Sequence, residues 1–318
     1  MGEPSRWHDY CVYGLSLRSR IPLRYPESAR RAGEIVVVSA SPAPFRKLLN
    51  GAFRQTAKSG VEHARLADGS TYLRWKGLSE FLVSADGNRI TCLPLNQVSS
   101  ESVHTYLLAQ VLSFALLKKG IEPLHATVVA VHGQAIGFLA GSGRGKSTLA
   151  ASFLQLGHRM LTDDLLVIRE HEDTLWAYPG PARIKLFPET ARRLLGDGIS
   201  GVRMNPGSPK LVIALPDHQI QWEPVPLRAL YVVAALTKAS RLKSVQIQKL
   251  SYRQAFLELL RHTFNTVVAE PWRLQQQFTF AALHASRFPV KRLSYARALA
   301  TLPRVREAIL ADLASMPK

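Results

Sequence analysis

The residues best suited to chemistry in this sequence form a glycine-rich turn at positions 141 to 145, followed directly by Lys146-Ser147-Thr148. Glycines let consecutive backbone N–H groups turn toward a single anion, and the lysine adds a positive charge beside the outer phosphates. The Ser147 hydroxyl is a suitable ligand for Mg²⁺. The residues that we expect to hold a nucleotide are Gly141, Ser142, Gly143, Arg144, Gly145, Lys146, Ser147 and Thr148.

Such a turn needs a strand before it and a helix after it, because the helix N-terminus carries the free N–H groups. The apolar run 135–140 predicts a buried strand, and an apolar helix is expected from Lys146 until Gly157 ends it. The sequence departs from the usual pattern G-x-x-x-x-G-K-[ST] at Ala140, where that pattern has its first glycine.

Two adjacent carboxylates, Asp163 and Asp164, interrupt the apolar segment 160–168, which otherwise predicts a strand. Aspartate is depleted in strands and costly to bury, so this pair indicates a site that binds a cation or transfers a proton. Because neighbouring side chains of a strand point to opposite faces, one carboxylate can face a metal while the other reaches elsewhere. A turn before the strand is the alternative interpretation.

The expected strand order brings a histidine toward the same place. Residues 124–131 predict a strand, and only 132–134 separate it from the strand 135–140. A parallel crossover needs about a dozen residues, so these two strands should pair antiparallel. His125 then lies near the phosphate-binding turn, where it is either functional or a structural histidine.

These motifs together carry a family resemblance over roughly residues 123 to 170. His125-Ala126, the short hairpin, the segment GSGRGKST, Gly157-His158 and Asp163-Asp164 resemble the HPr kinase/phosphorylase family. They are more similar still to HPr-kinase-related kinases of modified-peptide pathways, including the kinases that tailor lasso peptides.

The resemblance implies a P-loop serine kinase with an α/β core and a mixed sheet, related in fold to phosphoenolpyruvate carboxykinase. It implies ATP and Mg²⁺ as cofactors, with Lys146 at the phosphates and Ser147 on the metal. Asp163 is implied as the base that accepts the proton of the attacking hydroxyl, and Asp164 as a residue that orients the site or helps to bind the metal. His125 matches the histidine that precedes the first core strand of the family.

The chain departs from the family downstream of the aspartate pair. HPr kinases carry an acidic, glycine-containing segment there, whereas 178–186 of this sequence contains no acid. We therefore do not expect HPr itself as substrate or a reverse phosphorylase reaction. Arg183 and Lys185 alternate on an expected strand, where they either stabilise the transferring phosphoryl group or form a solvated edge. Lys210 is a similar candidate in an expected loop.

The composition excludes several classes of protein. The net charge of +18 attracts polyanions or an acidic partner, although the basic residues are scattered and a solvated basic surface explains them equally well. No aromatic-basic stripe accompanies them, so we do not expect a nucleic-acid partner. No apolar run reaches the roughly 18 residues of a membrane helix, and the N-terminus lacks a secretory signal. We expect a cytoplasmic protein that does not enter a membrane.

Two domains are expected within the 318 residues. Residues 1–98 read as a β-rich accessory domain, which either helps to capture a substrate or only packs. Residues 99–318 are expected to form the α/β catalytic domain, which begins with a helix that residues 99–101 cap and residues 118–120 end, and which finishes in a helical tail. His262 and His284 lie in that tail without partner spacing, and we assign them no function.

The sequence therefore predicts an ATP-dependent kinase that phosphorylates a serine hydroxyl of a peptide, such as a lasso-type ribosomal precursor, or of a protein. A small-molecule hydroxyl kinase is one alternative, and a nucleotide-switched ATPase or binding module is the other. Homo-oligomerisation stays open. The site residues predicted for catalysis are Asp163, His125, Lys146 and Arg183, and those predicted for the metal are Ser147 and Asp164.

Overall fold

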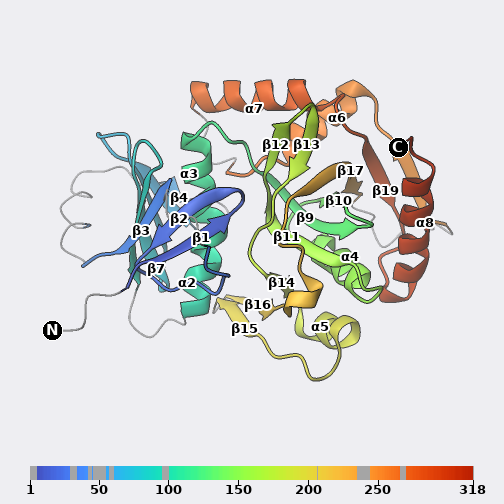
Figure 1. The fold of residues 1–318 in the computed structure, drawn as a ribbon, viewed down its shortest axis with the longest axis horizontal. Helices are drawn as coiled ribbons and strands as arrows, with labels where there is room; N and C mark the ends of the chain where they lie inside the picture. Colours follow the sequence, from blue (N-terminus) through green and yellow to red (C-terminus); the bar gives the residue numbers. More distant parts are fainter. Residues whose placement is uncertain are drawn as a thin grey trace. The chain divides into compact units, whose positions relative to one another are not determined.

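The computed structural model describes residues 6–28, 34–41, 45, 55–56, 61–94, 100–205, 207–234, 244–265 and 270–317. The chain divides into two compact units, each of which is described by itself (Figure 1). The first contains Met1–Pro123, Val202–Val212 and Asn265–Val268, and the second contains Leu124–Gly201, Ile213–Phe264 and Ala269–Lys318. The predicted boundary between residues 98 and 99 lies outside the described residues.

The first unit is built on a mixed sheet in the order β1-β2-β3-β8-β7-β6-β5-β4. Around Gly87, β7 pairs antiparallel with β8 and forms a hairpin. The strands are β1 (His8–Val12), β2 (Leu15–Ser19), β3 (Ile35–Ser39), β4 (Gln55–Thr56), β5 (Val61–Arg65), β6 (Thr71–Trp75), β7 (Ser79–Val83) and β8 (Arg89–Pro94). Strands β2, β3 and β8 are parallel neighbours, so the first unit is not a simple meander.

The helix expected between the cap at 99–101 and the end at 118–120 is present and packs on this sheet. It consists of α2 (Ser100–Tyr106), a π-helical segment (Leu107–Val111) and α3 (Leu112–Lys118). The Tyr106 ring lies 4.8 Å from the ring of Trp75 on β6. Gly87 also lies so close to the helix that a Cβ there would sit 2.8 Å from the Ala115 carbonyl oxygen. Because of these contacts, the helix belongs to the first compact unit, which includes all residues up to Pro123.

A short β-ribbon also belongs mostly to the first unit. It pairs β15 (Val202–Asn205) antiparallel with β16 (Ser208–Ala214). The Asn205 amide donates to the Tyr106 hydroxyl at 2.6 Å, which ties the ribbon to α2. The sequence placed Lys210 in a loop, but it lies within β16, which begins at Ser208.

The second unit contains a mixed sheet in the order β11-β9-β10-β17-β13-β12, with β19 also paired to β17 and β18 to β19. Strand β9 pairs antiparallel with β10, as predicted from the short connection, whereas β10, β17 and β19 run parallel. The strands are β9 (Leu124–Val131), β10 (Gln134–Leu139), β11 (Arg159–Leu166), β12 (Ile168–His171), β13 (Thr174–Ala177), β17 (Val225–Val233), β18 (Gln246–Lys249) and β19 (Val290–Ser294). This sheet confirms the expected α/β class with a mixed core sheet.

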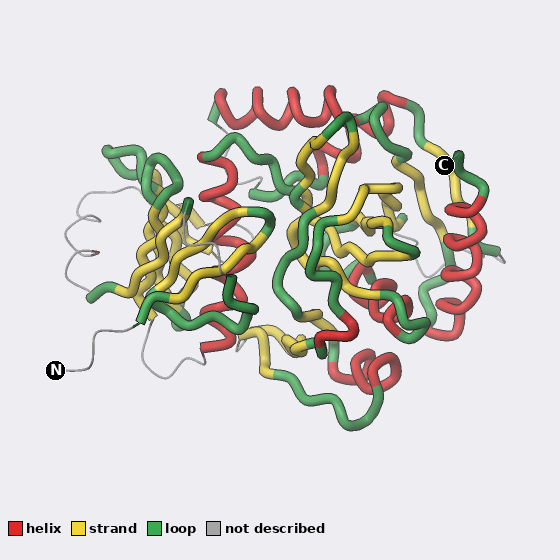
Figure 2. Tube along the Cα trace, in the orientation of Figure 1, coloured by secondary structure: helices red, strands yellow, loops and turns green. Residues whose placement is uncertain are grey.

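Helices cover both faces of this sheet, which explains why its central strands are apolar on both sides. On one face, Leu124, Ala126 and Val128 share a core with α6 (Tyr252–Arg261) and α7 (Pro271–His284). On the other face, the Phe138 ring lies 5.8 Å from Phe153 of α4 (Lys146–Leu154). Helix α8 (Leu302–Ala314) packs against α4, and Figure 2 shows the two helices (red) beside the strands (yellow).

The remaining elements of the second unit are short. They are β14 (Arg183–Leu186), α5 (Pro188–Leu195) and the 3-10 turns Asp217–Gln219 and Leu299–Thr301. Among the helices of the described residues, none is both long and apolar enough to cross a membrane.

Candidate active site

The glycine-rich turn joins β10 to α4, as the strand–turn–helix order of the sequence predicts. Gly143 and Gly145 have φ angles of 72° and 96°, a left-handed conformation that favours glycine. Gly145 is the residue before the first turn of α4, and the turn from Gly141 to Arg144 is exposed. The backbone N–H groups of the turn and of the helix N-terminus are therefore placed to bind an anion.

Ala140 is compatible with this turn although it breaks the usual pattern. Its φ angle is not among the positive values found in the described residues, so its conformation does not require glycine. Its side chain is buried, and its carbonyl oxygen accepts a hydrogen bond of 2.7 Å from the Lys146 ammonium. Alanine at this position is therefore compatible with the conformation of the turn.

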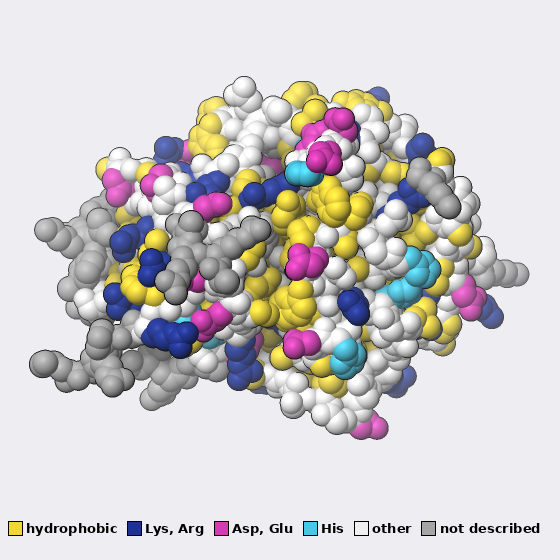
Figure 3. Space-filling view, viewed as in Figure 1, with side chains coloured by type: hydrophobic (Ala, Val, Ile, Leu, Met, Phe, Trp, Pro, Cys, Tyr) yellow, Lys and Arg dark blue, Asp and Glu magenta, His cyan; other side chains and the backbone are white. Residues whose placement is uncertain are grey.

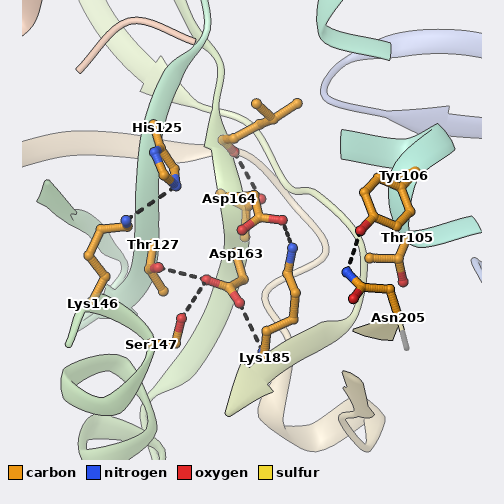
Figure 4. A network of polar contacts seen from close by, with 12 residues as sticks. Thr105, Tyr106, His125, Thr127, Lys146, Ser147, Asp163, Asp164, Lys185 and Asn205 are labelled. Atoms are coloured by element: carbon orange, nitrogen blue, oxygen red, sulfur yellow. Dashed lines mark hydrogen bonds and ion pairs between the residues drawn. The ribbon is translucent and has the colours of Figure 1, made fainter. Parts of the chain in front are cut away.

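The Lys146 ammonium lies between the turn and β9. Besides Ala140, it contacts the Gly141 carbonyl oxygen at 3.5 Å and the His125 ring nitrogen Nε2 at 3.2 Å (Figure 4). The antiparallel register explains the contact with His125, because Ala126 of β9 lies opposite Leu139 at the end of β10. The structure thus brings together the predicted lysine and histidine, with the charged end of Lys146 at the edge of the turn.

Asp163 is the centre of a second group of contacts, on β11. Its Oδ1 atom accepts hydrogen bonds from the hydroxyls of Thr127 at 2.6 Å and of Ser147 at 3.0 Å. Its Oδ2 atom accepts one from the backbone N–H of Lys185 at 3.0 Å. The carboxylate is buried, and these donors satisfy both of its oxygens.

Asp164 points to a different partner. Its carboxylate forms an ion pair with the ammonium of Lys185 on β14, and its backbone has a φ angle of 91°, which is uncommon for a residue other than glycine. Both neighbouring carboxylates therefore contact Lys185, Asp163 at its backbone N–H and Asp164 at its ammonium. Ser147, however, contacts Asp163 and not Asp164, although the sequence analysis grouped Ser147 with Asp164 as metal residues.

The Ser147 and Asp163 oxygens fit one divalent cation. Neighbouring ligands of an octahedral Mg²⁺ ion, each at about 2.0–2.1 Å, are about 2.9 Å apart. Ser147 Oγ and Asp163 Oδ1 lie 3.0 Å apart at the first turn of α4, beside the anion-binding turn. Mg²⁺ typically takes only one or two protein oxygens and completes its shell with phosphate and water. These two oxygens match that donor set.

Two further predicted site residues, Thr148 and Arg183, lie on α4 and β14. Thr148 follows Ser147 in the first turn of α4 and is half-buried. Arg183 lies two residues before Lys185 on the same strand, and both side chains are buried. Arg183 and Lys185 thus do not form a solvated edge, which removes one of the two interpretations of that pair.

His262 is a residue of this region to which the sequence analysis assigned no function. Burial, with smaller effects of the nearby Lys146 and Arg261 charges, lowers the pKa of His262 to about 4. Its carbonyl oxygen accepts a hydrogen bond from the His125 backbone N–H at 2.7 Å, and its ring lies 3.6 Å from Glu258. This contact joins the end of α6 to β9, and no local spacing in the sequence could have revealed it.

Comparison with known proteins gives partial matches to one family. No family model matches the chain. The HPr kinase/phosphorylase of Clostridium botulinum (strain Eklund 17B / Type B) is 37% identical over 97 residues, which is 30% of each chain. That of Shouchella clausii is 39% identical over 62 residues, or 19% of this chain and 20% of the other. That of Lachnoclostridium phytofermentans is 32% identical over 107 residues, or 33% of each chain.

A structural comparison gives the Hpr(Ser) kinase/phosphatase from Coxiella burnetii with a TM-score of 0.34 and 11% identity. That match covers 60% of this chain and 97% of the other chain. The sequence matches span about a third or less of the curated relatives. Within that span, the chain is similar to HPr kinase/phosphorylases.

Proposed function

We propose that this protein is an ATP-dependent kinase that transfers the γ-phosphoryl group to a serine hydroxyl of a peptide or protein. The observation that carries this proposal is the 3.0 Å contact between Ser147 and Asp163 beside the glycine-rich turn. It joins a hydroxyl and a carboxylate suited to Mg²⁺ with an anion-binding turn and its lysine. The partial similarity to HPr kinase/phosphorylases supports the same reaction class.

In this proposal, Ser147 and Asp163 hold Mg²⁺, and Lys146 binds the outer phosphates together with the N–H groups of the turn. The ammonium of Lys146, which now contacts Ala140 and Gly141, needs only to turn from these carbonyl oxygens toward the phosphates. When bound, Mg²⁺ supplies positive charge that offsets the charge developing on the transferring group. Thr127 then keeps the Asp163 carboxylate in one orientation.

We assign the acceptor side to Asp164 and Lys185. The Asp164 carboxylate accepts the proton of the serine hydroxyl while the serine oxygen bonds to phosphorus and ADP leaves. Lys185, which forms an ion pair with Asp164, stabilises the negative charge of the transferring phosphoryl group. We assign the same role to Arg183, which lies on the same strand. This division exchanges the roles that the sequence predicted for the two aspartates, because Asp163 is the one that contacts Ser147.

Two features of the protein, its net charge and the sheet of the first unit, bear on the nature of the acceptor. A net charge of +18 favours an acidic acceptor, and the first unit offers a sheet that ends, within the described residues, at strand β4, which can pair with an extended peptide. A serine near the end of a short ribosomal precursor peptide, as in lasso-peptide pathways, fits both features.

The test is phosphorylation of such peptides. Wild-type protein, Mg²⁺ and ATP are incubated with serine-containing precursor peptides, and intact-mass spectrometry with fragmentation locates any added phosphate. We expect one phosphate on serine, lost when that serine is replaced by alanine and absent with Lys146→Met protein. Unmodified peptides together with a phosphorylated sugar, amino acid or nucleoside would contradict a peptide acceptor and favour a small-molecule kinase.

A further inference from the structure

Arg297 approaches the anion-binding turn from an element to which the sequence analysis assigned no role. Its Nη2 atom donates a 3.0 Å hydrogen bond to the Gly143 carbonyl oxygen. A methyl group on Gly145 would lie 3.8 Å from Arg297 Nη2 and 3.8 Å from the Tyr295 hydroxyl. Residues 295 to 298 follow β19, which runs parallel to β17 and, through it, to β10. All three strands therefore end at the same edge of the sheet, where the turn lies.

The sheet order places Arg297 on the side of the turn away from the proposed reaction. Thr127 and Asp163 come from β9 and β11, which lie on one side of β10, whereas β17 and β19 lie on the other side. A triphosphate whose last phosphate faces Asp163 must extend its nucleoside end across the turn, toward β17 and β19. Arg297 lies at that end.

The Arg297 side chain has the chemistry to bind a phosphate there. A guanidinium carries five N–H donors, and the hydrogen bond to Gly143 uses one of them. Arg297 is exposed, so a ligand on the turn can reach the group. Charge-assisted hydrogen bonds from arginine to phosphate are among the stronger polar contacts in proteins. The bond to Gly143 also fixes the guanidinium beside the turn before the ligand arrives.

We propose that Arg297 is a nucleotide-binding residue that contacts the α-phosphate, the phosphate next to the nucleoside. This inference rests on the proposed function, because it requires a nucleoside triphosphate on the turn. The triphosphate is then bound by a cationic side chain at each end, Arg297 near the nucleoside and Lys146 at the outer phosphates. Arg297 therefore contributes to the affinity for ATP and ADP and not to the acceptance of the serine proton.

The experiment measures dissociation constants of Mg-ATP, ADP and inorganic tripolyphosphate by calorimetry, for the wild type, Arg297→Ala, Arg297→Lys and Arg306→Ala. Arg306 is a matched control, because it also donates to a backbone carbonyl of this unit, that of Ser152 at 2.6 Å, at the far end of α4. We expect Arg297→Ala to weaken all three ligands by about 10- to 100-fold, the range of a charge-assisted hydrogen bond. Arg297→Lys should recover part of that loss, and Arg306→Ala should bind as the wild type does.

Several results would overturn the inference. Unchanged affinities in Arg297→Ala would do so, as would losses no larger than those of Arg306→Ala. A loss for ADP and ATP without a loss for tripolyphosphate would show contact with the base and not with a phosphate. If the wild type binds neither nucleotide nor tripolyphosphate, the proposed function is overturned together with this inference. If the wild type binds them and Arg297→Ala binds them equally well, only this inference is overturned.

Discussion

At the scale of single residues, the two adjacent aspartates should respond differently to the same substitution. Asp164→Asn removes the proposed base and keeps its shape, so phosphoryl transfer should fall by about 10²- to 10⁴-fold while ATP affinity changes little. Asp163→Asn should instead raise the Mg²⁺ concentration needed for half-maximal activity, because Asp163 contacts Ser147. Steady-state rates over a magnesium series check both variants.

The opposite pattern would restore the roles predicted from the sequence, with Asp163 as the base. Thr127→Val serves as a control for indirect effects, because it removes a hydrogen bond to Asp163 without removing either carboxylate. We expect a smaller loss of activity in Thr127→Val than in either aspartate variant.

The buried His262 predicts a pH dependence of stability. Its pKa is about 4 in the folded protein, because burial, Lys146 and Arg261 oppose its protonation, and about 6.5 in an unfolded chain. Between these values the unfolded state binds more protons, so the free energy of unfolding should fall as the pH drops from about 6.5 to about 4. This group contributes at most about 1.4 kcal/mol per pH unit.

Urea unfolding of the wild type and His262→Gln across that range checks this prediction. The variant should show a shallower pH dependence within the window and the same dependence above it. Parallel curves for the two proteins would show that the His262 ring is not kept neutral by its surroundings.

Sequence reasoning placed the glycine-rich turn and its lysine between a strand and a helix, because these segments are local in the chain. It also placed His125 near Lys146, since a short connection between two strands fixes their pairing. It could not place His262 beside the same lysine or Arg297 beside Gly143, because these contacts join segments that only the tertiary fold brings together. The division between Asp163 and Asp164 likewise depends on Lys185, a residue of another element.

At the scale of elements, the central strand β10 is packed so tightly that one added methyl group should destabilise it. A Cβ on Gly137 would lie 2.5 Å from the Leu230 side chain on β17, and 3.6 Å from Leu166. Leu230 is fully buried, so it cannot move without disturbing its neighbours. Gly137→Ala should therefore lower the free energy of unfolding by about 1–3 kcal/mol, as measured by urea unfolding.

Gly198→Ala provides the matched control, because a Cβ there meets no atom within 4 Å and its φ angle is not in the left-handed region. The control should unfold within about 0.5 kcal/mol of the wild type. Similar losses for the two variants would mean that the close approach of β10 to β17 does not limit stability.

The periodicity of the sequence predicted most elements, and the differences have local causes. The expected strand over 160–168 is interrupted at Val167, where β11 ends and β12 begins after the unusual backbone of Asp164. The helix expected to begin at the cap 99–101 contains a π-helical segment, which hydrophobic spacing does not distinguish from an α-helix. The parallel pairing of β2, β3 and β8 was not predicted, because strand order between distant segments leaves no local pattern.

At the scale of the whole molecule, the net charge of +18 predicts a salt-dependent preference among acceptors. On the face that Figure 3 shows, Lys and Arg side chains are interspersed with Asp and Glu. We expect the effect to come from the summed field of these charges. For matched serine peptides, kcat/KM should favour the acidic peptide at about 0.01 M salt, and the preference should shrink at about 0.15 M. A preference that salt leaves unchanged would indicate specific contacts instead.

We propose above that the turn after β10 binds Mg-ATP through Lys146. Calorimetric titration of Mg-ATP into the wild type, Lys146→Met and the control Arg306→Ala tests this claim most directly, with circular dichroism to verify folding. We predict saturable binding by the wild type and Arg306→Ala, weakened at least about tenfold in Lys146→Met and in the wild type without magnesium. A folded wild type that does not bind Mg-ATP, or a Lys146→Met protein that binds it equally well, would contradict the account.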